Sequence, residues 1–122
     1  MKLFLTGVLK CDVPNDIFIA SHSVKGYLTK LGDIKKSWKR RWFRVDLKTR
    51  RVVYYPDESA TKECGEIRLS SVLRAVLPST PAARADNLLL LVTDRRTYQV
   101  KAPSAITCAF WCKLFQVLSP SA

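Results

Sequence analysis

The sequence predicts a mainly β protein, with seven antiparallel strands in a sandwich or barrel followed by one helix. From Val24 onward, short β-prone runs recur at intervals of about ten residues, separated by clusters of Gly, Pro, Asp, Asn and Ser. After Pro103 the apolar residues change to helical spacing. The 122 residues are enough for one hydrophobic core but too few for two. We therefore expect a single domain.

The expected strands fill the chain between an N-terminal extension and the helix. We expect an extension of undefined role over residues 1–22, with a possible short strand at Ile17–Ile19, and a folded domain over residues 23–119. Asp94–Arg96 is short enough to join two strands in a hairpin. The seven expected strands are Lys25–Lys30, Arg40–Asp46, Arg51–Tyr55, Gly65–Leu69, Val72–Leu77, Leu88–Thr93 and Thr97–Lys101.

One amphipathic helix of about fifteen residues is expected after Pro103. Ser104 is suited to cap its N-terminus, because its hydroxyl can accept a free backbone N–H. The expected apolar stripe consists of Ile106, Phe110, Trp111, Leu114, Phe115 and Leu118. We expect this stripe to cover the open end of the β unit, with Trp111 in the core.

The four cysteines, at positions 11, 64, 108 and 112, form no CxxC pair, and His22 is the one histidine. This set has no usual zinc spacing, so we expect no metal site and no cofactor. Buried free thiols in a reducing cytosol are the expectation. The apolar stretch Leu3–Leu9 is short for a signal sequence and lacks a small-residue cleavage site. No apolar run approaches the roughly 18 residues of a spanning helix, so we expect a cytoplasmic protein with peripheral membrane contact.

The charge indicates a polyanionic partner. The formal net charge is +11, and residues 25–51 hold eleven basic and two acidic side chains, a local net charge of +9. Nucleic acid, anionic lipid and an acidic protein are all compatible with this charge. Enzyme activity is not expected, because no catalytic triad, Gly-rich phosphate loop or paired-carboxylate motif is present.

The densest basic segment spans a strand, a loop and a second strand. Because side chains alternate across a strand, Lys39, Arg41 and Phe43 should share one face while Arg40 and Trp42 share the other. The basic groups of the first face, with those of the preceding strand end and loop, would form a cup at the mouth of a hairpin. Such a cup is suited to phosphate groups, which an arginine can bind through two parallel hydrogen bonds.

Several short motifs resemble, in their order and spacing, those of pleckstrin homology (PH) domains over residues 24–118. They are Gly26-Tyr27-Leu28-x-Lys30, Trp38-Lys39-x-Arg41-Trp42-Phe43, Val53-Tyr54-Tyr55, Gly65-Glu66-Ile67-x-Leu69, Thr97-Tyr98-x-Val100 and Trp111. The resemblance implies a seven-stranded, partly open β-barrel capped by a C-terminal helix. It also implies that the first hairpin holds an inositol phosphate headgroup.

Carried onto this chain, the resemblance implies a set of phosphoinositide-binding residues. Lys30, Lys39 and Arg41 would contact the ring phosphates. Lys36 would add a contact from the loop, and Tyr55 would donate a hydrogen bond to a phosphate. The implied partner is a phosphoinositide or anionic membrane surface.

The chain departs from the trisphosphate-selective, cytohesin-like members at three positions. Asp33 and Ile34 replace a Gly-Arg pair, and Cys64 replaces a basic residue before Gly65. The departures remove two expected donors and favour weaker, broader headgroup recognition. Ile34 and Lys35 are candidates for contact with the membrane itself.

The predicted function is therefore phosphoinositide binding that recruits a cytosolic parent protein to membranes as an adaptor or signalling module. The alternative is a PH domain that acts mainly as a protein–protein interaction module, with an acidic partner and weak, non-selective lipid binding. Nucleic-acid binding is not expected, because Trp38 and Trp42 resemble packing residues of the family and not a stacking platform. We expect a monomer.

Overall fold

The computed structural model describes residues 13–78 and 87–119. The predictions for Leu3–Leu9, for Cys11 and for most of the loop that follows Pro78 lie outside these residues.

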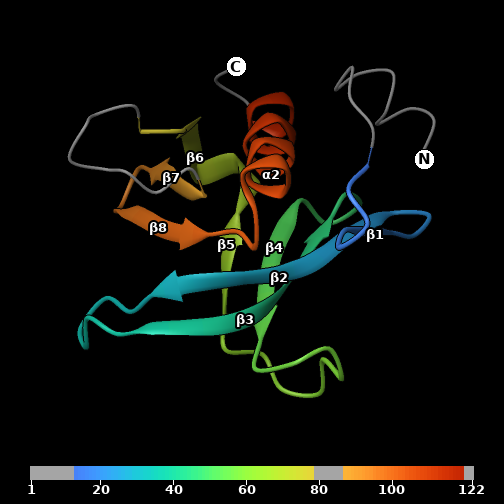
Figure 1. Ribbon diagram of the computed structural model, residues 1–122, viewed down its shortest axis with the longest axis horizontal. Coiled ribbons are helices and arrows are strands. Elements are labelled where there is room, and N and C mark those ends of the chain that lie inside the picture. The colour runs from blue at the N-terminus through green and yellow to red at the C-terminus, as the bar shows by residue number, and fades with distance from the viewer. Residues whose placement is uncertain (1–12, 79–86, 120–122) are drawn as a thin grey trace.

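The described strands form one antiparallel sheet, followed by one α-helix (Figure 1). Seven strands are hydrogen-bonded in the order β5-β4-β3-β2-β8-β7-β6, and β1 pairs with β2 off this path. The elements are β1 (Phe18–Ile19), β2 (Ser23–Leu31), β3 (Trp38–Asp46), β4 (Arg51–Tyr55), β5 (Gly65–Arg68), the 3₁₀ turn η1 (Leu69–Ser71), β6 (Val72–Val76), β7 (Leu88–Thr93), β8 (Thr97–Lys101) and α2 (Ala105–Leu118).

The predicted fold class is confirmed: a mostly β, open antiparallel sheet with one C-terminal helix. All seven predicted strands are present, and β2 and β3 extend further toward their shared loop than the sequence indicated. Strand β1 matches the possible short strand predicted at Ile17–Ile19, and Leu69 begins the 3₁₀ turn instead of ending a strand.

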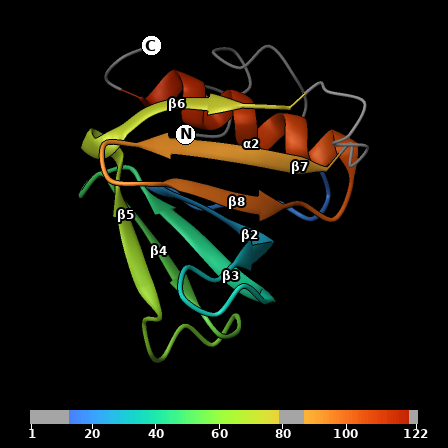
Figure 2. The ribbon, with the colours of Figure 1, turned by 90° about the vertical axis from the view of Figure 1, so that its left-hand side faces the viewer.

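The sheet bends so that its two halves face each other (Figure 2). In this view β6, β7 and β8 form one layer, β2 to β5 form the other, and α2 lies along β6 and β7. The turn η1 carries the chain from β5 to β6, which are not paired with each other. This arrangement leaves an open side that the helix covers.

Helix α2 begins as the sequence indicated. Ser104 is its N-cap, and the Ser104 hydroxyl accepts a hydrogen bond from the Thr107 N–H at 3.1 Å. The prediction that Ile106 belongs to the buried stripe is wrong, because its side chain is 75% exposed. The first turn presents Thr107 and Cys108 to the barrel instead, which leaves Ile106 at the solvent edge.

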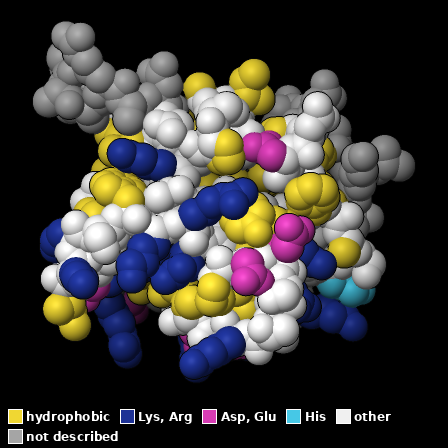
Figure 3. Space-filling model, turned by 60° about the horizontal axis from the view of Figure 1, so that its bottom comes forward, with side chains coloured by type: hydrophobic (Ala, Val, Ile, Leu, Met, Phe, Trp, Pro, Cys, Tyr) yellow, Lys and Arg dark blue, Asp and Glu magenta, His cyan; other side chains and the backbone are white. Residues whose placement is uncertain are grey.

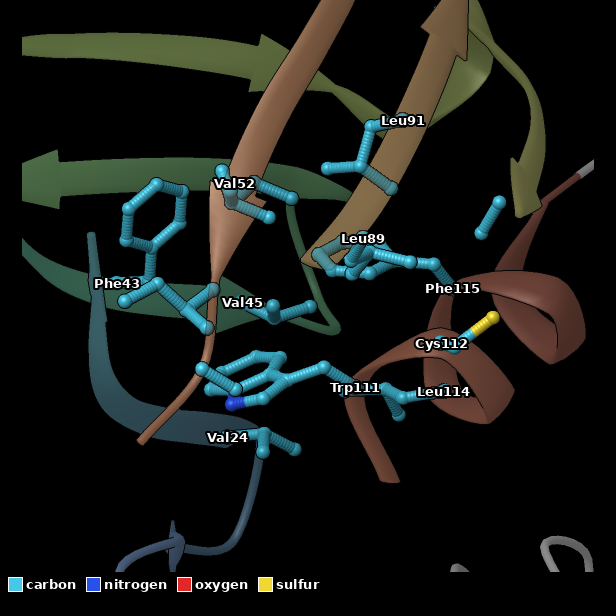
Figure 4. Close-up of a cluster of buried hydrophobic side chains, with 14 of the residues drawn as sticks. Val24, Phe43, Val45, Val52, Leu89, Leu91, Trp111, Cys112, Leu114 and Phe115 are labelled. Carbon is cyan, nitrogen blue, oxygen red and sulfur yellow. The ribbon is translucent and has the colours of Figure 1, made fainter. Parts of the chain in front are cut away.

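Trp111 fills the centre of the core, as predicted, with no exposed surface. Figure 4 shows its ring reaching from α2 toward Val24 and Val45 of the sheet. Gly26 permits this approach, since a Cβ atom at that position would lie 3.0 Å from Cζ2 of Trp111. Phe115 stacks beside it, with ring centroids 6.0 Å apart.

The segment before β2 packs onto the domain. Ile17 is buried in the core. The Thr107 hydroxyl donates a 2.7 Å hydrogen bond to the Asp16 carboxylate, which ties this segment to the start of α2. Part of the predicted N-terminal extension therefore contributes to the core.

The described cysteines divide into two kinds. Cys108 and Cys112 are buried free thiols, as predicted, and burial raises the pKa of Cys108 to about 11. Cys64 is exposed, so the prediction of burial is wrong for this residue. No helix in the described part of the chain is long and apolar enough to cross a membrane.

Candidate functional site

The register of the β2–β3 hairpin brings the predicted basic residues together. Lys30 lies directly opposite Lys39, and Leu28 lies opposite Arg41. Pleating therefore places all three basic side chains on the inner face of the hairpin, the face that further along β3 buries Phe43 in the core. The predicted division of β3 into two faces is confirmed, since Trp42 packs in a separate cluster.

A pocket of about 260 Å³ opens on this inner face. It lies beside the end of β2, the β2–β3 loop and the start of β3, with β4 and the residue before β5 as its far wall. The lining residues are Lys30, Gly32, Lys35, Ser37, Lys39, Arg41, Tyr54 and Cys64. Its volume is just below that of typical ligand pockets, about 300–1,000 Å³, and suits a small polar group.

The four basic side chains of the pocket have no carboxylate partner among the described residues. Arg41 makes one long hydrogen bond, 3.4 Å from Nη1 to the Arg40 carbonyl oxygen, so most of its donors stay free. The facing pair Lys30 and Lys39 is unfavourable without an anion, because like charges directly opposite in a sheet repel. The pocket therefore offers uncompensated positive charge.

Lys30 is a partly buried residue of the pocket, close to two tyrosine rings. Its Nζ lies 5.1 Å from the ring centroid of Tyr54 and 5.5 Å from that of Tyr98. Burial lowers the pKa of Lys30, the Arg96 guanidinium lowers it further, and the Asp33 carboxylate opposes these effects. A phosphate bound here would replace part of the lost hydration.

The structure does not place Tyr55, the predicted headgroup contact, at the pocket, which Tyr54 lines instead. Tyr55 is only 7% exposed and packs with Trp42 on the outer face of the sheet. Tyr54 pairs with Phe43, stacks on its ring at 5.2 Å and lines the pocket. Gly65 makes room for it, since a Cβ atom there would lie 2.4 Å from the Tyr54 hydroxyl oxygen.

The β2–β3 loop is tightly closed. Gly32 N–H donates to the Ser37 carbonyl at 3.0 Å, and Ser37 N–H donates to the Lys35 carbonyl at 2.7 Å. A Cβ atom at Gly32 would lie 2.3 Å from the Lys35 carbonyl oxygen, so the loop requires glycine at this position. The backbone fixes the loop side chains relative to the pocket.

The loop residues divide differently from the prediction. Lys35, predicted to contact the membrane, lines the pocket, whereas Lys36, predicted to contact the headgroup, is exposed outside it. Ile34, the predicted membrane contact, is 98% exposed. An apolar side chain thus projects from the tip beside the basic pocket.

On the outer face of the same hairpin, basic side chains contact aromatic rings. The Arg40 guanidinium carbon lies 3.5 Å from the Tyr27 ring centroid. Nζ of Lys101, from the neighbouring strand β8, lies 4.3 Å from the Trp38 ring centroid, and all four residues line a separate groove of about 450 Å³. Cation–π contact of this kind stabilises these groups without neutralising their charge.

Figure 3 shows the distribution of charge on the side of the molecule that carries the hairpin end. Most Lys and Arg side chains in view lie on the left-hand half, toward which the hairpin extends in Figure 1, and most acidic side chains lie on the other half. Among the described residues, no three His, Cys, Asp or Glu side chains are grouped to hold a metal ion.

Sequence reasoning missed Tyr54 and the pocket role of Lys35. The signal for Tyr54 was the short turn after Asp46: if Asp46 pairs with Arg51, as it does in the structure, then Tyr54 falls opposite Phe43. Lys35 carried no comparable signal, because the geometry of an irregular loop does not follow from alternation.

Comparison with known proteins identifies relatives of this chain. The model of the PH domain family matches residues 23–119. "Pleckstrin homology domain-containing family A member 2" of Bos taurus and of Homo sapiens are each 34% identical over 91 residues, covering 72% of this chain and 21% of the relative. The chain thus spans about a fifth of the length of these relatives.

Solved structures share the fold. The C-terminal PH domain of pleckstrin in complex with D-myo-Ins(1,2,3,4,5)P5 has a TM-score of 0.66 and 24% identity, over 84% of this chain and 98% of that one. The PH domain of human oxysterol binding protein-related protein 11 has a TM-score of 0.68 and 19% identity, over 82% of each chain. PH domains are non-enzymatic modules. The family match over most of the chain, together with the strand order and capping helix, shows that this chain belongs to the PH domain family.

Proposed function

We propose that this chain binds phosphoinositide headgroups in the inner-face pocket and thereby docks its parent protein onto membranes as a peripheral module. One observation carries the proposal: Lys30, Lys39 and Arg41 converge on one face of a hairpin with no carboxylate partner in the described residues. Uncompensated ammonium and guanidinium groups in a partly desolvated site favour a multiply charged phosphate ligand.

The surroundings of the pocket support a membrane-borne ligand. Ile34 is almost fully exposed at the tip of the loop from which Gly32, Lys35 and Ser37 line the pocket. An isoleucine that enters the apolar part of a bilayer gains about 1.5 to 3 kcal/mol from burial. The pocket and Ile34 lie at the same end of the hairpin. One docking event would therefore bring a headgroup into the pocket and Ile34 into the lipid.

A solved relative supports the ligand class. The C-terminal PH domain of pleckstrin was solved with two different inositol pentakisphosphates, D-myo-Ins(1,2,3,4,5)P5 and D-myo-Ins(1,2,3,5,6)P5. We transfer to this chain the general chemistry of an inositol ring bearing several phosphates, and no particular phosphate pattern.

Neighbouring arginines on opposite faces of β3 provide the test. Arg41→Ala removes a charge from the pocket, while Arg40→Ala removes the same charge from the outer face. Loss of a charge-assisted contact costs about 1.5 to 3 kcal/mol, so we expect Arg41→Ala to weaken headgroup binding roughly tenfold to a hundredfold. Arg40→Ala should weaken it much less. Calorimetry with soluble inositol phosphates measures both, and circular dichroism checks the fold.

Liposome sedimentation extends the test to membranes. Wild type should sediment with vesicles that contain phosphoinositide, and Ile34→Ser should weaken sedimentation without changing calorimetric affinity for the soluble headgroup. Equal losses for Arg40→Ala and Arg41→Ala would reject the pocket in favour of diffuse charge attraction. Absence of headgroup binding by the wild type would favour the alternative of an acidic protein partner.

A further inference from the structure

The β2–β3 loop and the β7–β8 turn meet beside the pocket. Strand β2 runs antiparallel to β8, with Lys30 opposite Val100, so both connections lie at the same end of the sheet (Figure 1). There Arg96 Nη1 lies 3.3 Å from Asp33 Oδ2. This ion pair joins the β2–β3 loop to the β7–β8 turn.

Arg96 acts on the pocket although it does not line it. Its guanidinium carbon lies 4.2 Å from the Tyr98 ring centroid, and the Nζ of Lys30 contacts the same ring. Arg96 lowers the pKa of Lys30 more strongly than Arg41 does, even though Arg41 lines the pocket. A phosphate held at Lys30 is therefore within electrostatic reach of Arg96.

Asp33 occupies, through one Nη1–Oδ2 contact, a position beside Arg96 that a phosphate oxygen could take. A guanidinium presents the same fork of N–H donors to a carboxylate as to a phosphate. The Asp33 side chain is 64% exposed and that of Arg96 25% exposed, and ion pairs with this much solvent contact are weak. A ligand that carries more negative charge than one carboxylate can therefore replace Asp33.

We infer that Arg96 is a further phosphate-binding residue and that Asp33 is an internal competitor, which the headgroup must displace to reach it. The inference rests on the proposed function and deepens it. Arg96, in the turn between β7 and β8, supplies an arginine that is missing from the β2–β3 loop, where Ile34 stands instead. Asp33 then selects against headgroups that have no phosphate within reach of Arg96.

The experiment is a double-mutant cycle on the full chain, with calorimetry against inositol 1,4,5-trisphosphate and inositol 1,3,4,5-tetrakisphosphate. Asp33→Asn removes the competing charge and keeps the shape of the side chain. Arg96→Gln removes the guanidinium, while the backbone N–H and carbonyl of Arg96 keep their hydrogen bonds to the Thr93 hydroxyl. Asp94→Asn is the matched control, because it removes a carboxylate from the same turn without affecting the pair.

We expect Asp33→Asn to tighten binding by up to about fivefold, the range of an exposed ion pair, and Asp94→Asn to change it by less than twofold. Arg96→Gln should weaken binding about tenfold, as for the loss of one charge-assisted contact. In the Arg96→Gln background, the gain from Asp33→Asn should shrink to that of Asp94→Asn. A gain in affinity caused by a general charge effect or by a loosened loop would persist in the Arg96→Gln background.

Equal gains from Asp33→Asn and Asp94→Asn, or a gain from Asp33→Asn that persists in the Arg96→Gln background, would overturn the inference alone, provided that Arg41→Ala still weakens binding. A wild-type chain that binds neither headgroup, or whose binding is indifferent to Arg41→Ala, would overturn the proposed function and this inference together.

Discussion

Along β3, neighbouring arginines meet opposite conditions. On the outer face, Arg40 lies over the Tyr27 ring, and Trp42 packs with Tyr27 at a centroid distance of 4.8 Å. On the inner face, Arg41 borders a pocket whose basic groups have no carboxylate partner in the described part of the chain. The two faces share one backbone and one register, so the difference arises entirely from what the side chains contact.

The contacts of the two faces determine where the positive charge of the chain is available for binding. Basic groups on the outer face are partly satisfied by aromatic rings, and their contacts stabilise the fold. On the inner face, Lys30 also lies near two aromatic rings, but no basic group of the pocket has a carboxylate partner among the described residues, and the facing lysines repel each other. Substitutions on the outer face should therefore change stability first, and those on the inner face should change binding first.

The largest expected effect is on stability and comes from Trp42→Ala on the outer face. Trp42 is buried against Val53 and Tyr55, and Tyr27, which it contacts, accepts a hydrogen bond from the Glu58 N–H. Truncation of a buried aromatic residue costs about 3 to 5 kcal/mol of unfolding free energy. Urea unfolding measures the loss.

Trp38→Ala is the control for this prediction, because Trp38 is on the same face but 38% exposed, and its loss should be smaller. Headgroup affinity of the folded Trp42→Ala protein should stay near the wild-type value. Equal unfolding free energies of Trp42→Ala and Trp38→Ala would show that the cluster of Trp42, Val53 and Tyr55 does not support the fold.

The second prediction concerns pH on the inner face. Burial and Arg96 lower the pKa of Lys30 below its ordinary value of 10.5. An anion binds the protonated amine, so affinity for a headgroup should fall as pH rises through the lowered pKa. Full loss of this charge-assisted contact would weaken binding about tenfold or more. Burial raises the pKa of Tyr54, so the tyrosine hydroxyl stays neutral over this range.

Calorimetry in alkaline buffers checks the pH dependence, with Lys30→Arg as the control. Arginine stays protonated at every accessible pH, so the part of the slope that belongs to Lys30 should vanish in this variant. Identical pH profiles for wild type and Lys30→Arg would mean that the ammonium of Lys30 does not contact the ligand.

The sequence predicted the elements well because their signals are local. Turn residues and β-prone runs located all seven main strands, and the hydroxyl of Ser104 marked the start of the helix. Face assignment succeeded in β3, where basic and aromatic residues alternate. The tyrosine carried over from the family resemblance was one position off, because Tyr54 and Tyr55 are chemically alike and only the pairing register distinguishes them.

Features that depend on contacts between distant segments could not be predicted. Ile106 has the right spacing for the apolar stripe, but it lies at the solvent edge because Thr107 and Cys108 are the buried residues of the first turn. The Asp33–Arg96 pair joins residues more than sixty positions apart on two hairpins. Only the β2–β8 pairing brings those hairpin ends together.

The smallest expected effect is a gain in stability from Lys39→Gln on the inner face. Lys39 lies directly opposite Lys30, and like-charge pairs of this kind cost about 0.2 to 1 kcal/mol. Removing one charge should raise the unfolding free energy at low salt by a similar amount and weaken headgroup binding at the same time. The gain should disappear in 1 M salt, where charges are screened beyond about 3 Å.

Arg40→Gln, the control on the outer face, should instead lower stability, because it removes the contact with the Tyr27 ring. Urea unfolding at two salt concentrations separates these effects. A loss of stability in Lys39→Gln at low salt would show that Lys39 is already satisfied in the free protein, and that the inner face does not differ from the outer one.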